Sequence, residues 1–370
     1  MRSFQPFVAG LVLTASLATR VSAQGPSPTP VPSVAAVPSI DSIFAAYDHP
    51  DVPGASVIVI RNGAVVLSRA YGMANLEDRV PATERTSYRL ASVTKQFTAT
   101  AILLLVHDGK LHLDDHVIDV LPGFPAYAKA VTIRQLLTHT GGLWAYEDFV
   151  PDTQSVQAHD HDIPRLIGRV DSTYFTPGAK YRYSNTGYVV LGLVVEAVSH
   201  QPFATFLRDR IFKPLGMDST VAYQAGISTV PQRAYGYSKV KGGTAYHRTD
   251  QSSTSATLGD GGIYTSTHDM VLWNRALDEH LLIDADMQKL AWTPQRLNDG
   301  SISNYGFGWN VGDSPLGRHI WHTGETRGFR NAILKYPDRG LTVIVLTNRS
   351  ESDPLPLAER VAAMPAFSSP

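Results

Sequence analysis

The sequence predicts an α/β fold in which an antiparallel sheet is flanked by the terminal helices, with a mainly helical domain inserted between the strands. Two observations lead to this prediction. Strand-like apolar runs stand near both ends of the folded region, and residues 92–299 contain short apolar-periodic helices broken by glycine and proline turns. We therefore expect one domain over residues 39–364. Its α/β part is formed by about 39–91 and 300–364, and a cleft lies where this part meets the helical part.

The elements follow in order along the chain. The domain opens with a short amphipathic helix, SIDSIFAAYD, and two β-branched runs then flank Asn62-Gly63, a dipeptide that supplies the positive φ angles of a tight hairpin turn. A helix is predicted from Ser92 to about Asp108, because Gly109 follows as a stop signal. Near the C-terminus we expect strands in YGFGWNVG, RHIWHTG, GFRNAILKYP and LTVIVLTN, and a last helix in PLPLAERVAAM.

The N-terminal residues precede this domain and have a different composition. Residues 1–23 are predicted to be a signal peptide, because Arg2 precedes a short apolar run and small residues stand before Gln24. The apolar run is shorter than the ~20 residues that a membrane-spanning helix needs. Residues 24–38 are rich in proline and serine, which predicts an extended tether. We therefore expect an exported protein, periplasmic or secreted, without a membrane span after signal removal.

Composition narrows the possible functions. The net charge of the 370-residue chain is −1, so nothing indicates binding to nucleic acid or to an anionic membrane surface. The chain has no cysteine, which excludes thiol catalysis, disulfides and cysteine-ligated zinc. Residues 159–162 read His-Asp-His-Asp, but no third metal ligand is indicated and a polar loop is the better interpretation. We expect no cofactor or metal and a small-molecule or peptide substrate; the oligomeric state is left open.

A serine followed three residues later by a lysine occurs twice, at Ser92 and Lys95 and at Ser238 and Lys241. A serine hydroxyl needs an adjacent base to become a nucleophile, and helix positions three apart share a face. Ser92 opens a predicted helix, whose N-terminal N–H groups favour negative charge, and a buried lysine there can lose its proton. Ser238 lies in the polar stretch YGYSKVKGGT, which favours exposed lysines. We therefore predict Ser92 as the nucleophile and Lys95 as its base.

A tyrosine followed two residues later by an asparagine stands at Tyr183 and Asn185, just before an apolar helix. These residues suit a helix-entry turn, but Tyr183 is also placed to exchange a proton and Asn185 to bind a substrate carbonyl. The aromatic residues Trp144, Tyr146 and Phe149 either line the cleft or pack a loop, and the sequence does not decide between these interpretations.

The triplet His322-Thr323-Gly324 ends one strand-like run and precedes another, and a copy of it begins at His139. A strand edge presents backbone N–H groups in a fixed direction, as an oxyanion hole requires. The copy at His139 follows a helix and enters a glycine loop. We therefore assign His322, Thr323 and Gly324 to the site and interpret His139 as structural.

Together, the serine-lysine, tyrosine-asparagine and histidine-threonine-glycine motifs resemble those of the serine β-lactamase and penicillin-binding protein superfamily. The Tyr-x-Asn form is similar to the class C-like branch, which holds class C β-lactamases, D,D-carboxypeptidases, D-aminopeptidases and related esterases. The resemblance extends over about residues 40–364 and includes LLTHTGGL, YSNTGYVVLG, LGDGGIYTSTHDM and YGFGW. It implies a β-lactamase-like fold and an acyl-enzyme mechanism.

The resemblance also implies residue roles. Ser92 would attack a carbonyl, and Lys95 and Tyr183 would share the proton transfers. The backbone N–H groups of Ser92 and Glu325 would form the oxyanion hole. Substrate would be bound by the remaining motif residues, Asn185, His322, Thr323 and Gly324.

Two residues depart from the pattern of true β-lactamases. His322 replaces the usual lysine, and a neutral imidazole attracts a substrate carboxylate less strongly. Glu325 stands where a small residue is common, and Arg327 or Arg330 could hold its charge away. We therefore expect a serine hydrolase acting on peptide, amide or ester bonds, with D-amino-acid peptides and small esters favoured over β-lactams. The alternatives are a β-lactamase proper and a slow-turnover penicillin-binding receptor.

Overall fold

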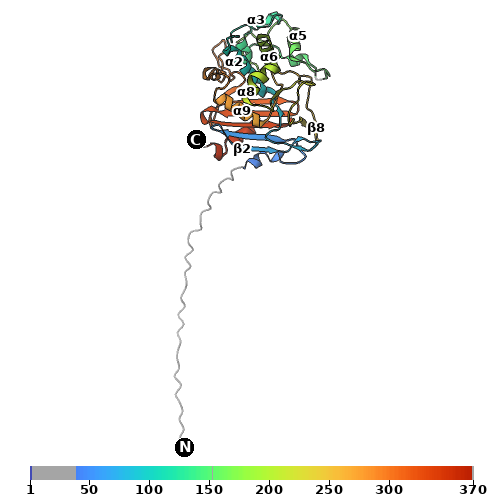
Figure 1. Cartoon of the computed structure of the whole chain (residues 1–370), viewed down its shortest axis with the longest axis vertical. Coiled ribbons are helices and arrows are strands. Elements are labelled where there is room, and N and C mark those ends of the chain that lie inside the picture. The colour runs from blue at the N-terminus through green and yellow to red at the C-terminus, as the bar shows by residue number, and fades with distance from the viewer. Residues whose placement is uncertain (2–38, 152, 369–370) are drawn as a thin grey trace. The chain divides into compact units, whose positions relative to one another are not determined.

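A six-stranded antiparallel sheet with the order β10-β11-β12-β13-β1-β2 forms the centre of the fold. It is seen in a computed structural model that describes residue 1, residues 39–151 and residues 153–368. In Figure 1 the blue strands from the start of the domain lie beside the orange and red strands from its end. The strands are β1 (Ala55–Arg61), β2 (Ala64–Tyr71), β10 (Asn310–Ser314), β11 (Gly317–Thr326), β12 (Phe329–Tyr336) and β13 (Leu341–Thr347).

The hairpin between β1 and β2 forms where the sequence predicts it. Asn62 and Gly63 have φ angles of 49° and 78°, so both adopt the left-handed conformation that a two-residue turn requires. Strand β1 then pairs with β13, with Ala55 opposite Thr347. This pairing joins the two ends of the domain in one sheet and confirms the predicted α/β class.

The two faces of the sheet are covered by different layers. On β1, Val57 and Val59 pack in a core with the terminal helices, whereas Ile58 and Ile60 belong to the core shared with the central helical region. This alternation follows from the two-residue period of a strand. The terminal layer consists of α1 (Ile40–Ile43), η1 (Ala45–Tyr47), α11 (Pro354–Ala362) and α12 (Pro365–Ser368).

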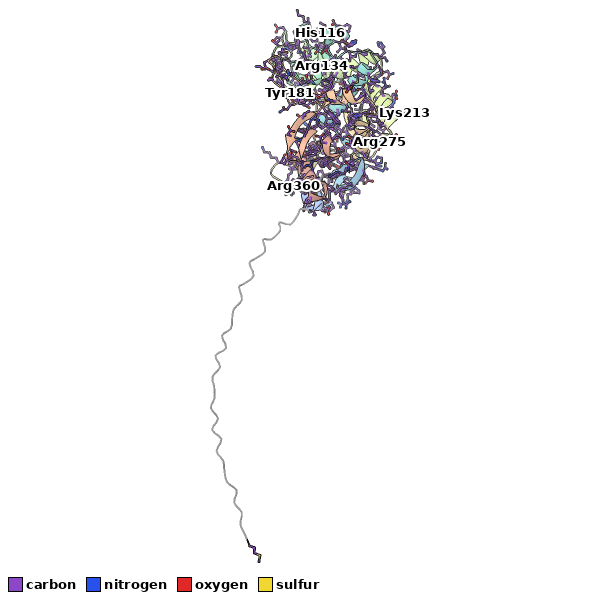
Figure 2. All side chains as sticks on the ribbon, turned by 90° about the vertical axis from the view of Figure 1, so that its left-hand side faces the viewer. His116, Arg134, Tyr181, Lys213, Arg275 and Arg360 are labelled. Atoms are coloured by element: carbon purple, nitrogen blue, oxygen red, sulfur yellow. The ribbon has the colours of Figure 1, made fainter. Side chains whose placement is uncertain are left out.

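The central region is mainly helical, as expected, and contributes strands to two small sheets, while a third small sheet is formed by residues 73–81, before this region. In Figure 1 its helices α3 and α5 lie at the end of the body opposite β2. Figure 2 labels His116 and Arg134 at that end and Arg360 of α11 at the other. The small sheets are β5-β9-β6 (Tyr88–Arg89, Ile263–Thr265, Val221–Ala222), β3-β4 (Met73–Asn75, Val80–Pro81) and β7-β8 (Tyr237–Lys239, Tyr246–Arg248).

Helix α2 (Lys95–His107) forms part of the buried core of this region. It is buried along nearly its whole length and packs against α6 (Asn185–Ser199). The other helices of the region are η2 (Ala91–Thr94), α3 (Val117–Val120), η3 (Ala126–Ala128), α4 (Ile133–Leu137), η4 (Tyr146–Phe149), η5 (Asp160–Asp162), α5 (Ile163–Ile167), α7 (Phe203–Leu207), η6 (Arg208–Phe212), α8 (Lys213–Leu215), α9 (Thr267–Asp278) and α10 (Ala285–Ala291). A further short turn, η7 (Pro337–Arg339), joins β12 to β13.

Two predicted boundaries are shifted. The α-helix expected from Ser92 begins at Lys95, because residues 91–94 form a 3₁₀ turn. The strand expected over 305–312 begins at Asn310. Gly308 interrupts that segment with a φ of 77°, and a side chain there would lie 2.8 Å from the carbonyl oxygen of Lys95. The close approach to α2 therefore sets the start of β10.

The predicted signal peptide (1–23) and tether (24–38) lie outside the described residues apart from Met1. In the part of the chain that is described, no single helix is long and apolar enough to span a membrane. One bent pair, α6 with Phe203–Leu215, meets the criteria of length and composition at an angle of 78° between its halves. The same part of the chain holds no group of three or more metal-ligating side chains.

Candidate active site

Ser92 is carried by the 3₁₀ turn η2, between β5 and α2. The preceding residue, Ala91, has a φ of 50°, a conformation that side-chain-bearing residues rarely adopt. Strand β11 lies directly against this turn at Gly324, where a β-carbon would stand 1.9 Å from the carbonyl oxygen of Leu90. Only glycine therefore allows β11 to approach the turn that carries Ser92 this closely.

Lys95 lies next to Ser92 and is completely buried. Its Nζ donates hydrogen bonds to Ser92 Oγ at 3.0 Å, to Asn185 Oδ1 at 2.7 Å and to the backbone oxygen of Asp260 at 2.9 Å. Burial lowers the pKa of Lys95 to about 8, although the carboxylates of Asp260 and Glu147 oppose the shift. Near neutral pH, part of the Lys95 amine is therefore unprotonated and can act as a base.

The acceptors around Lys95 determine where its lone pair points. Asn185 Oδ1 and the Asp260 carbonyl can only accept hydrogen bonds. When the ammonium loses one proton, its two remaining N–H groups stay with these acceptors. The lone pair then faces Ser92 Oγ, which is the direction that a base needs.

Glu147, a residue that the sequence analysis missed, holds Asn185 in place. Its Oε1 accepts a hydrogen bond of 2.6 Å from Asn185 Nδ2. Because a carboxylate accepts at this point, the amide of Asn185 must turn its oxygen toward Lys95. Burial raises the pKa of Glu147, and the hydrogen bond from Asn185 opposes this rise. One N–H of Asn185 thus remains for a substrate carbonyl, the role predicted for it.

Tyr183 lies next to Lys95, just before α6. The Lys95 Nζ is 5.0 Å from the centre of its ring. Desolvation raises the pKa of the Tyr183 hydroxyl, and a hydrogen bond with Ser92 opposes this rise. The residue as a whole remains 39% exposed. Tyr183 is therefore a neutral phenol beside Ser92, suited to giving a proton to a leaving group.

His322 is 2% exposed, and both of its ring nitrogens are occupied. Nδ1 lies 2.6 Å from the backbone oxygen of Thr323, so it carries the proton, and Nε2 accepts a 2.8 Å hydrogen bond from the Tyr305 hydroxyl. Burial lowers its pKa to about 3, so the imidazole is neutral. A substrate contact by this side chain, as predicted, would have to replace one of these hydrogen bonds.

His139, interpreted from sequence as structural, packs directly against the site. Its ring centre lies 4.3 Å from that of Tyr183. Its Nδ1 accepts a hydrogen bond from the N–H of Ser184, and its backbone oxygen accepts one from Arg182. The copy of the triplet at His139 thus braces the segment that carries Tyr183, a role closer to the site than the sequence indicated.

A cavity of about 410 Å³ opens at Ser92. Its lining includes Asn185 and Glu325, while His322, Thr323 and Gly324 contribute no lining atoms. Ser92 and Glu325, whose N–H groups are the predicted oxyanion hole, therefore share this cavity. The other lining residues are Arg89, Ala91, Tyr146, Glu147, Ser252, Thr254, Thr257, Asp260, Gly261, Thr326, Arg327, Arg330 and Ser350.

The negative charge of Glu325 is held by Arg330, one of the two arginines considered for this role. The Arg330 guanidinium donates to Glu325 Oε1 at 2.6 Å across the β11-β12 pair. The Glu325 side chain is 73% exposed, so the ion pair lies at the edge of the cavity. The backbone of Glu325 and its side chain can thus act independently.

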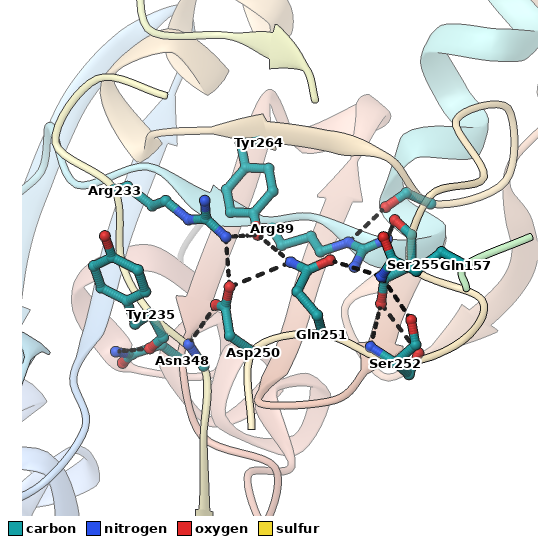
Figure 3. Close-up of polar contacts among 12 residues, drawn as sticks. Arg89, Gln157, Arg233, Tyr235, Asp250, Gln251, Ser252, Ser255, Tyr264 and Asn348 are labelled. Carbon is teal, nitrogen blue, oxygen red and sulfur yellow. Dashed lines mark hydrogen bonds and ion pairs between the residues drawn. The ribbon is translucent and has the colours of Figure 1, made fainter. Parts of the chain in front are cut away.

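One wall of the cavity is the loop around residues 250–257, and Figure 3 shows how it is fixed. Asp250 accepts hydrogen bonds from Arg233 and from Gln251, and the guanidinium of Arg89 donates to the Ser255 carbonyl at 2.7 Å. Gln157 donates to the Ser252 carbonyl at 2.7 Å. These contacts hold the wall rigidly beside Ser92.

The structure also locates the second serine-lysine motif and the three aromatic residues whose role the sequence left undecided. Ser238 lies in β7 and hydrogen-bonds with Thr249 and Ser350, while Lys241 is exposed. Among the aromatic residues, Tyr146 lines the cavity, whereas Trp144 stacks on Tyr174 and donates to a loop carbonyl. Phe149 packs against the core of the domain.

An antiparallel sheet with inserted helices is one feature of this protein, and a Ser-Lys-Tyr site where the two parts meet is the other. Together they are typical of one class of serine hydrolases, those that form an acyl-enzyme on the serine of a Ser-x-x-Lys motif. Residues 40–364 match the family model described as Beta-lactamase. The chain therefore belongs to the β-lactamase family.

Two curated relatives are similar to this chain over most of its length. Penicillin-binding protein 4* of Bacillus subtilis (strain 168) is 33% identical over 329 residues, covering 84% of this chain and 72% of that protein. Protein flp of Staphylococcus aureus (strain MW2) is 29% identical over 309 residues, and the match covers 80% of this chain but only 60% of that protein.

Two solved structures share the fold over most of the chain. The octameric penicillin-binding protein homologue from Pyrococcus abyssi superposes with a TM-score of 0.76 at 27% identity, covering 88% of this chain and 75% of that one. The D-amino acid amidase from Ochrobactrum anthropi SV3, complexed with L-phenylalanine amide, gives a TM-score of 0.74 at 25% identity, covering 89% and 98%.

Proposed function

We propose that the protein is a serine hydrolase that forms an acyl-enzyme on Ser92 and cleaves small amides, peptides or esters. The observation that carries this proposal is the hydrogen bond of 3.0 Å between Lys95 Nζ and Ser92 Oγ. Because the other two N–H groups of the lysine are held by Asn185 Oδ1 and the Asp260 carbonyl, the neutral amine directs its lone pair at the hydroxyl.

In the acylation step, Ser92 Oγ attacks the substrate carbonyl carbon and its proton passes to Lys95. The oxyanion that forms is stabilised by the backbone N–H groups of Ser92 and Glu325. The carbon–leaving-group bond breaks as Tyr183 gives its proton to the leaving group, and Lys95 restores the proton of the phenol. Water then attacks the acyl-enzyme with the same groups acting in reverse, which releases the acid and the free serine.

Among substrates, amides and peptides of D-amino acids are favoured and β-lactams are disfavoured. A D-amino acid amidase shares the fold over almost its whole length, which supports the first choice. The second follows from His322, which stays neutral because burial lowers its pKa to about 3 and which therefore offers no cation to a β-lactam carboxylate. The N-terminal residues 1–23, with their signal-like pattern, support export to the periplasm or the medium as part of the proposal.

A substrate panel tests the proposal. The mature protein is assayed with a D-amino acid p-nitroanilide, a p-nitrophenyl ester and a chromogenic β-lactam, beside the Ser92→Ala variant. We expect turnover of the anilide and the ester that disappears in Ser92→Ala, with the β-lactam slowest. A β-lactam that turns over faster than both others would instead make the protein a β-lactamase, and a stable β-lactam adduct without turnover would make it a receptor.

A further inference from the structure

One residue of the His-Asp-His-Asp segment at 159–162 faces the interior, although the sequence predicted a polar loop there. Asp160 begins η5, and its carboxylate lies between α6 and the chain at residues 258–259. The β-carbon position of Gly192 on α6 is 3.8 Å from Asp160 Oδ1. Burial raises the pKa of Asp160 to about 7, although hydrogen bonds from backbone N–H groups oppose this rise. The carboxylate is therefore part of the packed interior.

The Asp160 carboxylate accepts hydrogen bonds from two consecutive backbone N–H groups. Leu258 N donates to Oδ2 at 2.9 Å and to Oδ1 at 3.2 Å, and Gly259 N donates to Oδ1 at 3.1 Å. Both carboxylate oxygens thus act as acceptors. Hydrogen bonds to an ionised carboxylate are stronger than those between neutral groups. The ionised side chain therefore fixes the backbone at residues 258 and 259.

The next residue of this segment contacts the lysine of the active site. The backbone oxygen of Asp260 accepts a hydrogen bond of 2.9 Å from Lys95 Nζ. The Gly259 carbonyl accepts one of 2.6 Å from Thr98 Oγ1 on α2, the helix that begins at Lys95. The segment is thus held by α2 through its carbonyl groups and by Asp160 through its N–H groups. Loss of the carboxylate would release one of these two attachments.

We propose that Asp160 is a positioning residue for the base: its carboxylate holds the Asp260 carbonyl on Lys95 Nζ and so keeps the lysine lone pair directed at Ser92 Oγ. Asp160 lines a separate cavity of about 80 Å³ and contributes no lining atoms to the cavity at Ser92. It therefore acts through the backbone of residues 258–260. This inference rests on the proposed acyl-enzyme function.

The charged groups around Asp160 come from the elements packed against it. Asp260, on the segment that it holds, raises the pKa of Asp160 by repulsion between the two carboxylates. Glu196 of α6 lines the same cavity and pairs with His161 at 2.8 Å, and His159 lines this cavity as well. Because the pKa of Asp160 is about 7, its carboxylate is mostly ionised at pH 9 and mostly neutral at pH 6. Its hold on the segment is therefore present above pH 7 and lost below it.

Asp160→Asn tests this role without changing the size of the side chain. Either orientation of the amide puts its NH₂ group against a backbone N–H, so at least one hydrogen bond is lost. The ammonium form of Lys95 then loses the Asp260 carbonyl as an acceptor, and the pKa that governs kcat/KM should decrease by about one unit. With N-acetyl-D-alanine p-nitroanilide, we expect kcat/KM to fall about tenfold at pH 9. The difference should close by pH 6, where the unmodified carboxylate is itself mostly neutral.

Asp162→Asn is the matched control. Asp162 lies on the same turn, but its carboxylate contacts Arg165 and the backbone N–H of His159 instead. Its pH profile should match that of the unmodified enzyme. An Asp160→Asn profile equal to this control would overturn the positioning role. A loss of the same factor at every pH would overturn it too, because a general packing defect gives that result.

A measurement on the unmodified protein covers the case in which Asp160→Asn does not fold. In an NMR titration, the amide signals of Leu258 and Gly259 should shift near pH 7, and the Cε signal of Lys95 should show a transition at that pH in addition to its own near pH 8. Absence of this additional transition would overturn the positioning role.

Failure of the positioning role and failure of the proposed function give different results. If the anilide or a p-nitrophenyl ester acylates Ser92 while Asp160→Asn and Asp162→Asn have the same profile, only the positioning role is wrong. If neither compound acylates Ser92 in the unmodified protein, the proposed function and the positioning role are both wrong.

Discussion

Lowering the assay pH from 8 to 6 should slow acylation strongly, because Ser92 is activated by the neutral form of Lys95. Burial lowers the pKa of this lysine to about 8 from its ordinary value near 10.5. About half of it is then neutral at pH 8 and about 1% at pH 6, since each pH unit below the pKa reduces that fraction almost tenfold. We therefore predict a decrease of about 50-fold in kcat/KM between these pH values.

The sign of this effect follows from the direction of the shift. A lysine with a lowered pKa gains its active neutral form as the pH rises, so kcat/KM should increase up to about pH 8 and then level off. Tyr183 acting as the base would give a different profile, because desolvation raises its pKa above the ordinary value of 10. The increase would then continue beyond pH 10.

The assay uses an N-acetylated p-nitroanilide, whose groups do not titrate in this range, with kcat/KM measured from pH 6 to 10. Lys95→Arg should lose activity at every pH, because a guanidinium does not release its proton under these conditions. Lys241→Arg is the matched control, since Lys241 is exposed in the rival motif. A profile that is flat between pH 6 and 8, or one that survives in Lys95→Arg, would refute the assignment of the base.

Two further predictions concern the tyrosine and the glycine of the site. Tyr183→Phe should reduce kcat/KM by a factor on the order of 10² to 10⁴, typical of losing general acid–base help, whereas Tyr181→Phe should keep most activity; equal losses would show that only packing matters. Gly324→Ala should lower the free energy of unfolding by about 1–3 kcal/mol in a denaturant titration and reduce turnover, because its β-carbon would lie 1.9 Å from the Leu90 carbonyl oxygen. Gly243→Ala, where the nearest atom is 3.7 Å away, is the control, and a Gly324→Ala variant as stable as this control would contradict the close packing of β11 on η2.

The fold could be predicted from the sequence because several of its elements carry clear local sequence signals. Asn62-Gly63 predicts a hairpin turn by itself, and the apolar runs of β12 and β13 predict strands without knowledge of their partners. The residues at which the helices and strands begin were harder to predict. The 3₁₀ turn at Ser92 depends on β11 pressing against Leu90, a contact with a strand more than 200 residues further along the chain.

The site was predictable to the extent that its residues stand in short motifs. Ser92 and Lys95 are one helical turn apart, so their contact follows from local geometry. Glu147 has no such signal, because it belongs to no short motif and its partner Asn185 lies 38 residues later. His139 was underestimated for a related reason, since its contact with Tyr183 depends on how two loops pack together.

The most direct test of the account is to locate the acyl group. The purified protein is mixed with a p-nitrophenyl ester, quenched within the first turnover, and analysed by intact mass and peptide mapping. We predict one acyl adduct on Ser92, present also in Ser238→Ala and absent from a Ser92→Ala variant whose thermal melt is nearly unchanged. An adduct that persists in Ser92→Ala, or that maps to another residue, would contradict the claim that Ser92 is the nucleophile.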